Sequence, residues 1–236
     1  MSATVIAQNT HKAEASATAA AARATLLREG PILPTLVRLS LPNLIALCSA
    51  TVVSIAETAY VGSLGVAALG GIALVFPIFM LMQMLSAGAM GGTVSGAISR
   101  ALGGGDHDGA QALALCSLAI GLALGLVLTV AVLTVGPLAY RQLGGSGPVL
   151  QQAIIYSNVA ALGILAIWAT NILASIARGS GNMAIPASTQ LAAGVVQIIV
   201  GGAFGLGIGP VPRLGMAGVA LGQLVAFSCA AITLFL

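Results

Sequence analysis

Charge is what this sequence has least of. Only 6% of its 236 residues are Asp, Glu, Lys or Arg, and the formal net charge is +3. A soluble globular domain carries about 25% charged residues, so this chain has too little polar surface to stay folded in water. The shortage excludes a soluble enzyme, a disordered chain and a nucleic-acid-binding protein, which would need a basic patch. With 58% hydrophobic residues, the composition indicates an integral membrane protein.

Reactive side chains are equally scarce. The three cysteines stand singly inside apolar runs, at Cys48, Cys116 and Cys229, without the spacing of a metal site. The glycine run 103–105 before Asp106 lacks the Gly-Lys-Ser/Thr ending of a phosphate loop. The apolar runs contain no Ser/His/Asp, Cys/His or paired-carboxylate arrangement. We therefore expect no enzymatic activity, no cofactor and no metal site.

Long stretches of the chain carry no charged residue at all. They run from Glu57 to Arg100, from Asp108 to Arg141 and from Arg141 to Arg178. A membrane-spanning helix needs roughly 20 apolar residues, and turn-forming glycines separate the apolar runs. These features predict helices at 36–60, 66–97, 109–136, 149–176, 183–206 and 215–236. The predicted fold class is all-α, a membrane protein with six transmembrane helices.

The two ends of this arrangement differ in basic residues. Residues 1–30 are rich in Ala, Ser and Thr and are interpreted as a mobile cytoplasmic tail, with 31–236 forming the transmembrane lobe. Lys and Arg collect on the cytoplasmic side of membrane proteins. One side of the six helices holds Lys12, Arg23, Arg28, Arg38, Arg100 and Arg178, and the other holds Arg141 and Arg213. The asymmetry predicts that both termini are cytoplasmic.

Glu57 is the acid that falls within a predicted span. An acid inside the membrane is costly and marks a functional site by default, and a carboxyl group that leaves water binds a proton more readily. Counted from Arg38, Glu57 lies near the end of its span, so an interfacial position remains an alternative. Steps of three and four residues place Asn43, Ser54 and Glu57 on one helical face. This small, polar face predicts a cavity wall that ends in an ion-coupling acid.

Amide side chains on the other predicted helices are further candidates for that cavity: Gln83, Asn171, Gln190 and Gln197. Gln190 and Gln197 are seven residues apart and share a helical face. A single amide in a membrane helix more often makes a hydrogen bond between helices than binds a ligand, and both interpretations stay open. Several amides that converge with one acid predict a site for a polar or cationic substrate.

Prolines and glycines mark places where the helices bend or approach closely. Pro42, Pro77 and Pro186 lie inside or near the start of predicted spans, where each frees a backbone carbonyl. We predict hinges or kinks at these three positions. Glycine pairs spaced by four residues, such as Gly201 with Gly205 and Gly218 with Gly222, allow helix backbones to approach closely in lipid.

Four segments of the chain, taken together, resemble the amino-terminal half of the MATE (multidrug and toxic compound extrusion) transporters. They are Leu39–Pro42 with Ala56–Gly65, Gly92–Ser95 leading into Arg100–Gly105, Ala177–Asn182 with Pro186, and Gly209–Ala220. Each motif alone is loose, and their order and spacing carry the resemblance. It extends from about residue 31 to the end of the chain.

The resemblance implies ion-coupled efflux of drugs or organic cations by alternating access between two six-helix lobes. It assigns Glu57 to ion coupling, where the family more often has Asp. Counted back from the glycine-proline turn, Val195 and Ile199 stand where many members carry Asn and an acid on the fifth helix. The incomplete cation site favours H⁺ over Na⁺ as the coupling ion. A lipid or amphiphile flippase-like lobe is the alternative, although no Lys or Arg lies in the middle of a span.

The family has twelve helices, so the resemblance also implies a second six-helix lobe as a partner. That lobe is either a carboxy-terminal half or a second copy of the chain. Residues 232–236 have no flanking Lys or Arg, which favours a truncated or split gene product, and an inactive fragment is a further alternative. The other expected partners are a small, cationic organic substrate and the lipid bilayer of a bacterial inner membrane, but no nucleic acid.

Overall fold

The computed structural model describes residues 32–208 and 211–236. Several side chains in the first turns of the first helix, those of Pro42 and Asn43 among them, lie outside this description. The chain divides into two compact units, Met1–Leu44 and Ile45–Leu236. Of the first unit only residues 32–44 are described, all helical, and the predicted tail at 1–30 lies outside the described residues.

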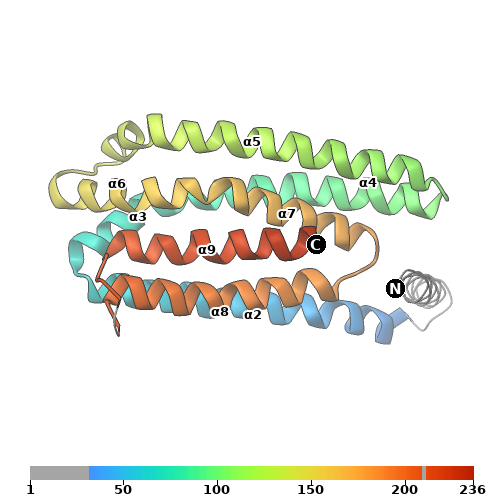
Figure 1. Cartoon of the computed structure of the whole chain (residues 1–236), viewed down its shortest axis with the longest axis horizontal. Helices are drawn as coiled ribbons and strands as arrows, with labels where there is room; N and C mark the ends of the chain where they lie inside the picture. Colours follow the sequence, from blue (N-terminus) through green and yellow to red (C-terminus); the bar gives the residue numbers. More distant parts are fainter. Residues whose placement is uncertain (1–31, 209–210) are drawn as a thin grey trace, which may run out of the picture. The chain divides into compact units, whose positions relative to one another are not determined.

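Helices make up nearly all of the described chain (Figure 1). They are α2 (Ile32–Ser63), α3 (Val66–Gln83), the π-helical segment η1 (Met84–Met90), α4 (Gly91–Gly103), α5 (His107–Gln142), α6 (Gly147–Leu162), α7 (Ile164–Gly179), α8 (Ala184–Leu206) and α9 (Met216–Phe235). The described ranges contain no strand. The prediction of an all-α fold is therefore confirmed.

Each of the six segments predicted from the apolar runs falls on helical structure, but two of them are not single helices. The segment predicted at 66–97 consists of α3, η1 and α4, and it extends to Gly103. The segment predicted at 149–176 consists of α6 and α7, which meet at Gly163 with a bend of 47°. A lone glycine among many others gave no sequence signal for that bend.

Several of these helices are long and apolar enough to cross a membrane. Four stretches meet this description, Val66–Gly103, His107–Gln142, Ala184–Leu206 and Met216–Phe235, and the bent pair α6–α7 is a fifth if it forms one span. The helix α2 is not included in this count. The multi-pass membrane class is supported, and the number of six spans stays a prediction.

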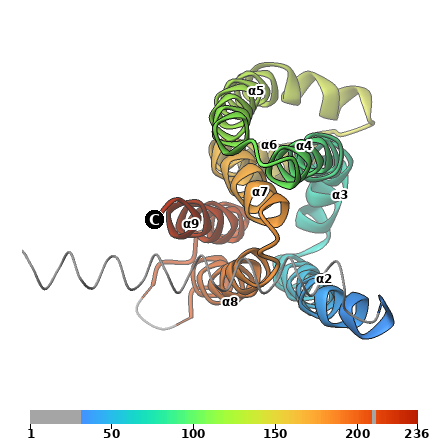
Figure 2. The same cartoon turned by 90° about the vertical axis from the view of Figure 1, so that its right-hand side faces the viewer.

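Within Ile45–Leu236 the helices pack along their lengths (Figures 1 and 2). The closest pair is α8 and α9, where a Cβ atom added to Gly222 would lie only 2.6 Å from the Cα atom of Gly201. The predicted close approach of glycine-bearing helices is thereby confirmed for this pair. The helix α7 packs against α4, α5 and α9, and α6 packs against α3 and α9.

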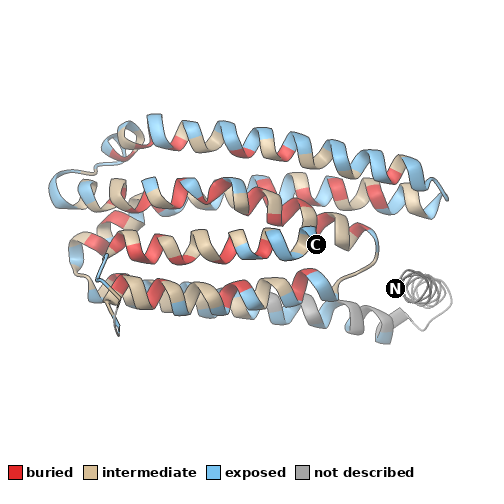
Figure 3. Cartoon of the chain, in the orientation of Figure 1, coloured by how far each residue is buried: buried red, intermediate tan, exposed pale blue. Residues whose placement is uncertain are grey.

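The residues that are buried lie where the helices pack against one another (Figure 3). The helix α7 is buried along most of its length and contributes Ile164, Trp168 and Ile172 to a hydrophobic cluster. By contrast, α5 leaves large apolar side chains uncovered, with Leu115 64% and Val127 62% exposed. Apolar side chains on the outside are stable in contact with lipid tails, which are as apolar as leucine. The described chain thus combines a buried hydrophobic interior with an apolar outer surface, as membrane proteins do.

Candidate functional site

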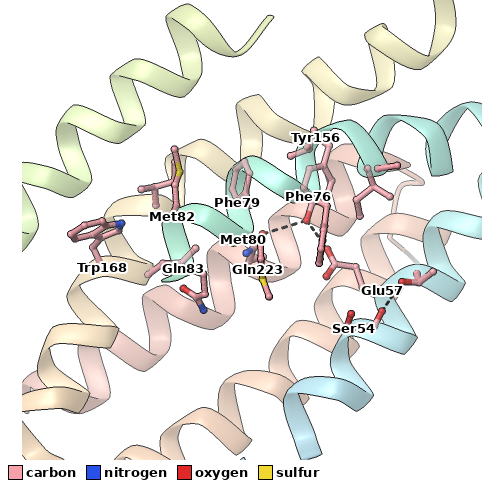
Figure 4. Close-up of a pocket in the computed structure, with 16 residues that line it drawn as sticks. Ser54, Glu57, Phe76, Phe79, Met80, Met82, Gln83, Tyr156, Trp168 and Gln223 are labelled. Atoms are coloured by element: carbon pink, nitrogen blue, oxygen red, sulfur yellow. Dashed lines mark hydrogen bonds between the residues drawn. The ribbon is translucent and has the colours of Figure 1, made fainter. Parts of the chain in front are cut away.

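A cavity of about 550 Å³ opens within the second unit, among α2, α3, α6, α7 and α9 (Figure 4). Its polar lining includes Ser54, Glu57, Gln83, Tyr156 and Gln223. Its apolar lining is rich in aromatic and methionine side chains, namely Phe76, Phe79, Met80, Met82 and Trp168. Binding sites for small molecules measure about 300–1,000 Å³ and combine an apolar wall with a few polar groups. The cavity has the size and lining of such a site.

Glu57 is held at one end of this cavity by side chains from other helices. The Tyr156 hydroxyl on α6 donates a hydrogen bond to Glu57 Oε1, with 2.6 Å between the oxygens. The Gln197 amide on α8 donates from Nε2 to Glu57 Oε2 over 3.4 Å. The Tyr156 oxygen also lies 3.4 Å from Oε1 of Gln223 on α9. The carboxyl group of Glu57 therefore lies among polar groups of three other helices, and Figure 4 shows it directed toward the cavity.

A second, much smaller cavity of about 10 Å³ lies beside Glu57 and is lined by Gln197 and Gly201 of α8, among others. A space of this size holds about one water molecule. Val195 and Ile199 are 56% and 63% exposed and are not among its lining residues. The α8 residues that line this cavity are Gln197, Ile198 and Gly201. Val195 and Ile199 line neither this cavity nor the large one.

A chain of hydrogen bonds lies behind the wall of the large cavity. Asn171 on α7, only 8% exposed, donates from Nδ2 to Gln83 Oε1 at 3.1 Å and to Ser86 Oγ at 2.9 Å. The Ser175 hydroxyl donates to the backbone oxygen of Asn171 at 2.7 Å and accepts from Arg178 at 2.8 Å. Asn171 thus joins α7 to the π-helical segment, and only its partner Gln83 lines the cavity.

The structure brings together some of the predicted cavity residues and not others. Ser54 and Gln83 line the large cavity, and Gln197 contacts Glu57 from α8. Gln190, partly buried on the same helix, lines neither cavity and makes no hydrogen bond with a described residue. The side chain of Asn43 lies outside the described residues.

The three prolines occupy different settings. Pro77 lies inside α3 and precedes η1 by about two helical turns, while Pro186 is buried in the first turn of α8. The side chain of Pro42 lies outside the described residues. Their roles as hinges or kinks stay predictions. The change from α- to π-helix occurs after Gln83 rather than at a proline.

Three residues of the site were missed by reasoning from the sequence. Gln223 is an amide inside a predicted span and could have been found by the rule that selected the other amides. Tyr156 is a polar aromatic residue within a predicted span, and Trp168 is the one tryptophan in the chain. Neither carries a signal that pairs it with a distant residue. Tyr156 and Glu57 are 99 positions apart.

Comparisons with known proteins agree with this architecture. A family model described as MatE matches residues 42–202. A curated FAD transporter of Shewanella oneidensis is 28% identical over 205 residues, which make up 84% of this chain and 44% of that protein. The likeness also extends to solved structures.

Two solved structures show the extent of that likeness. A MOP superfamily transporter from Pyrococcus furiosus, described as having a binding pocket of reverse polarity, matches with a TM-score of 0.78 and 29% identity over 84% of this chain and 43% of that one. The crystal structure of a MATE mutant matches with a TM-score of 0.81 and 28% identity, covering 89% of this chain and 46% of that one. The chain therefore spans less than half the length of these relatives.

Proposed function

Because this chain belongs to the MatE family, we propose that it forms the substrate-binding and proton-coupling lobe of a secondary exporter for small organic cations. The observation that carries the proposal is the position of Glu57 in the wall of a cavity of about 550 Å³. A carboxyl group at that position can hold either a proton or the charge of a cationic substrate. Competition between the two for one site couples the export of the cation to the entry of a proton.

The groups around Glu57 favour a proton over Na⁺. Tyr156 and Gln197 both present hydrogen-bond donors to the carboxylate oxygens. A bound Na⁺ ion would need oxygen ligands in place of these donors. Among the described residues that line the cavity, Glu57 is the one charged side chain, so the arrangement matches exchange of a single proton.

The remaining lining favours a cationic and apolar substrate. Aromatic rings such as Phe79 and Trp168 attract cations through their faces, and methionines such as Met80 and Met82 adapt to ligands of different shape. The described lining contains no Lys or Arg that would neutralise a pyrophosphate. This composition argues against transferring to the present chain the FAD substrate named for the Shewanella relative.

The same proposal extends to the partners and the location. The MATE structures that this chain matches are about twice as long as the matched segment, so we assign the chain a second lobe, from a second polypeptide, a second copy or further sequence. Alternating access then exposes the cavity to each side of a bacterial inner membrane. The excess of Lys and Arg on one side of the helices supports a cytoplasmic location for both termini.

The test is the binding of tetraphenylphosphonium, an apolar organic cation, to the purified chain at several pH values. For the native chain the affinity is expected to rise with pH, because protons compete with the cation for Glu57. Glu57→Gln should remove the pH dependence. It should also weaken binding about thirty- to hundredfold, because a carboxylate and a cation about 6–8 Å apart attract each other by about 2–3 kcal/mol at an effective dielectric constant of about 20.

Asp108→Asn is the matched control, because Asp108 is an exposed acid in the first turn of α5 and does not line the cavity. This variant should bind the cation as the native chain does. Binding by Glu57→Gln that still depends on pH, or displacement of the cation by Na⁺ at constant ionic strength and pH, would overturn proton coupling at Glu57.

A further inference from the structure

The hydroxyl group of Tyr156 has two oxygen atoms within reach but only one proton to donate. Its oxygen lies 2.6 Å from Glu57 Oε1 and 3.4 Å from Gln223 Oε1 (Figure 4). A phenolic hydroxyl donates one hydrogen bond and can also accept. The Tyr156 proton can therefore serve only one of the two side chains at a time.

The side-chain amide of Gln223 has one end at Tyr156 and one end open. Its oxygen contacts the Tyr156 hydroxyl, and its nitrogen donates to no described residue. The described polar atoms that are buried without a partner belong to Tyr140 and Trp168, so the nitrogen of Gln223 is not buried. Because Gln223 lines the large cavity, the open end of its amide faces that cavity.

When Glu57 is ionised, the Tyr156 proton points to the carboxylate. A distance of 2.6 Å is typical of a hydroxyl that donates to a charged oxygen. The Tyr156 oxygen can then only accept from Gln223, and the group of Gln223 that donates is its NH₂ group. The two ends of a carboxamide have nearly the same shape, so a half-turn brings the NH₂ group to Tyr156. The Gln223 oxygen then faces the cavity as an acceptor.

When Glu57 binds a proton, these hydrogen bonds reverse. Gln197 donates to Glu57 Oε2, which leaves Oε1 as the oxygen that carries the proton. The carboxylic acid then donates to the Tyr156 oxygen, and the Tyr156 proton turns to Gln223 Oε1. The structure shows Gln223 in this orientation, with its oxygen at Tyr156. The amide then presents its NH₂ group, a donor, to the cavity.

The titratable side chains that face Glu57 are tyrosines. Tyr156 comes from α6, and Tyr60, about one turn further along α2, lines the small cavity beside the acid. The described residues of α3, α7, α8 and α9 that line the two cavities are uncharged and do not titrate. A phenol is a much weaker acid than a carboxyl group. Proton binding to Glu57 is therefore the change that redirects Tyr156 as the pH varies.

We propose that Gln223 is a specificity-determining residue, and that the proton on Glu57 selects, through Tyr156, whether its amide offers the substrate an acceptor or a donor. Because Tyr156 contacts both side chains, a group bound to Glu57 Oε1 lies next to Gln223 as well. With Glu57 ionised, the two side chains offer two acceptors. They fit an organic cation whose charged end carries N–H groups, such as an amidinium or an aminoquinolinium. With Glu57 protonated, the NH₂ group of Gln223 opposes the same cation. The inference rests on the proposed function, since Glu57 is the proton-binding group.

Two cations of the same shape isolate the N–H group. The 4-amino-1-methylquinolinium cation carries an NH₂ group where 1,4-dimethylquinolinium carries a CH₃ group, and both charges are permanent. The measured quantity is the preference of the purified chain for the amino probe, with and without Gln223→Met. At a pH high enough to ionise Glu57, the substitution should lower this preference about fivefold, the typical strength of one net hydrogen bond. At low pH it should not lower the preference, because the amide then presents a donor.

Tyr156→Phe removes the link between Glu57 and Gln223. In that background Gln223→Met should change the preference by the same factor at both pH values, because the amide no longer responds to the acid. A merely structural role of Tyr156 would not abolish this pH dependence. Gln190→Met is the matched control, because Gln190 is a partly buried amide on α8 that lines neither cavity. It should keep the native preference at both pH values.

Tetraphenylphosphonium has no N–H group and separates this inference from the proposed function. Its pH-dependent binding should survive Gln223→Met, which also shows that the variant is folded. A preference for the amino probe that Gln223→Met leaves intact at high pH overturns the contact with Gln223. An equal loss at both pH values, with Tyr156 present, overturns the selection by the proton. In either case tetraphenylphosphonium still reports the role of Glu57.

The unaltered chain gives a test that needs no variant. Its preference for the amino probe should rise with pH as Glu57 loses its proton and the Gln223 oxygen turns to the cavity. A preference that stays constant with pH overturns the inference, even where the binding of tetraphenylphosphonium depends on pH.

Discussion

The bridge from Asn171 to the π-helical segment gives the sharpest stability prediction. Asn171→Leu keeps a side chain of similar size but removes the donor to Gln83 and to Ser86, which is 0% exposed. Hydrogen bonds between membrane helices average about 0.6 kcal/mol, and a buried polar group left without a partner costs about 1–3 kcal/mol. The free energy of unfolding should therefore fall by about 2 kcal/mol.

Unfolding by a denaturing detergent in mixed micelles measures this change. The fluorescence of Trp168, three residues from the mutation, reports local loss of structure, and circular dichroism reports loss of helix. Asn158→Leu is the matched control, because Asn158 is exposed on α6 and makes no hydrogen bond with a described residue. The control should change the free energy of unfolding by no more than about 0.5 kcal/mol. Equal stability of the two variants would refute the argument that Asn171 holds α7 against η1.

Two glycine substitutions test close packing at other places. Gly222→Val should lower the free energy of unfolding by about 1–3 kcal/mol, because its Cβ atom would lie 2.5 Å from the backbone nitrogen of Gly201; the measurement is the same unfolding experiment. Gly125→Leu should shift the emission of Trp168 to longer wavelength, because a Cβ atom added to Gly125 would lie 3.2 Å from Cβ of Trp168 and the new side chain displaces the indole from its buried position; steady-state fluorescence records the shift. Gly92→Val is the control for both, since no described atom outside the neighbouring backbone of its own helix lies within 4 Å of a Cβ atom added there; a control effect as large as either would contradict the packing argument.

Much of the fold is predictable from the sequence because membranes impose a simple rule. Backbone groups in lipid must satisfy one another, so a long apolar run such as 109–136 has to be helical. The close contact of Gly201 with Gly222 is likewise predictable in kind, since only small residues allow such an approach. The bend at Gly163 is not predictable, because nothing local distinguishes that glycine from those that lie within straight helices.

The candidate site was predictable only in part. Glu57 could be found because an acid in an apolar run is rare. The polar stripe of its helix predicted a cavity wall, and Ser54 of that stripe lines the large cavity. Tyr156, which contacts Glu57, and Gln223 beside that tyrosine come from helices far along the chain, and only the packing of α6 and α9 brings them near. Gln190 resembled Gln197 in spacing and composition, yet only Gln197 reaches the acid. Gln190 and Gln197 share a helical face but lie two turns apart along the helix axis. Periodicity predicts the face and not the level at which a distant residue such as Glu57 lies.

The bend of 47° at Gly163 has a consequence for recognition. Tyr156 lies on α6 and Trp168 lies on α7, so the angle between the two helices sets the distance between the Glu57 end of the cavity and the end lined by Trp168. A smaller bend between α6 and α7 would fit a longer substrate, and a larger bend would fit a shorter one. Any change of the bend angle at Gly163 during transport would also change which substrates contact both ends of the cavity at once.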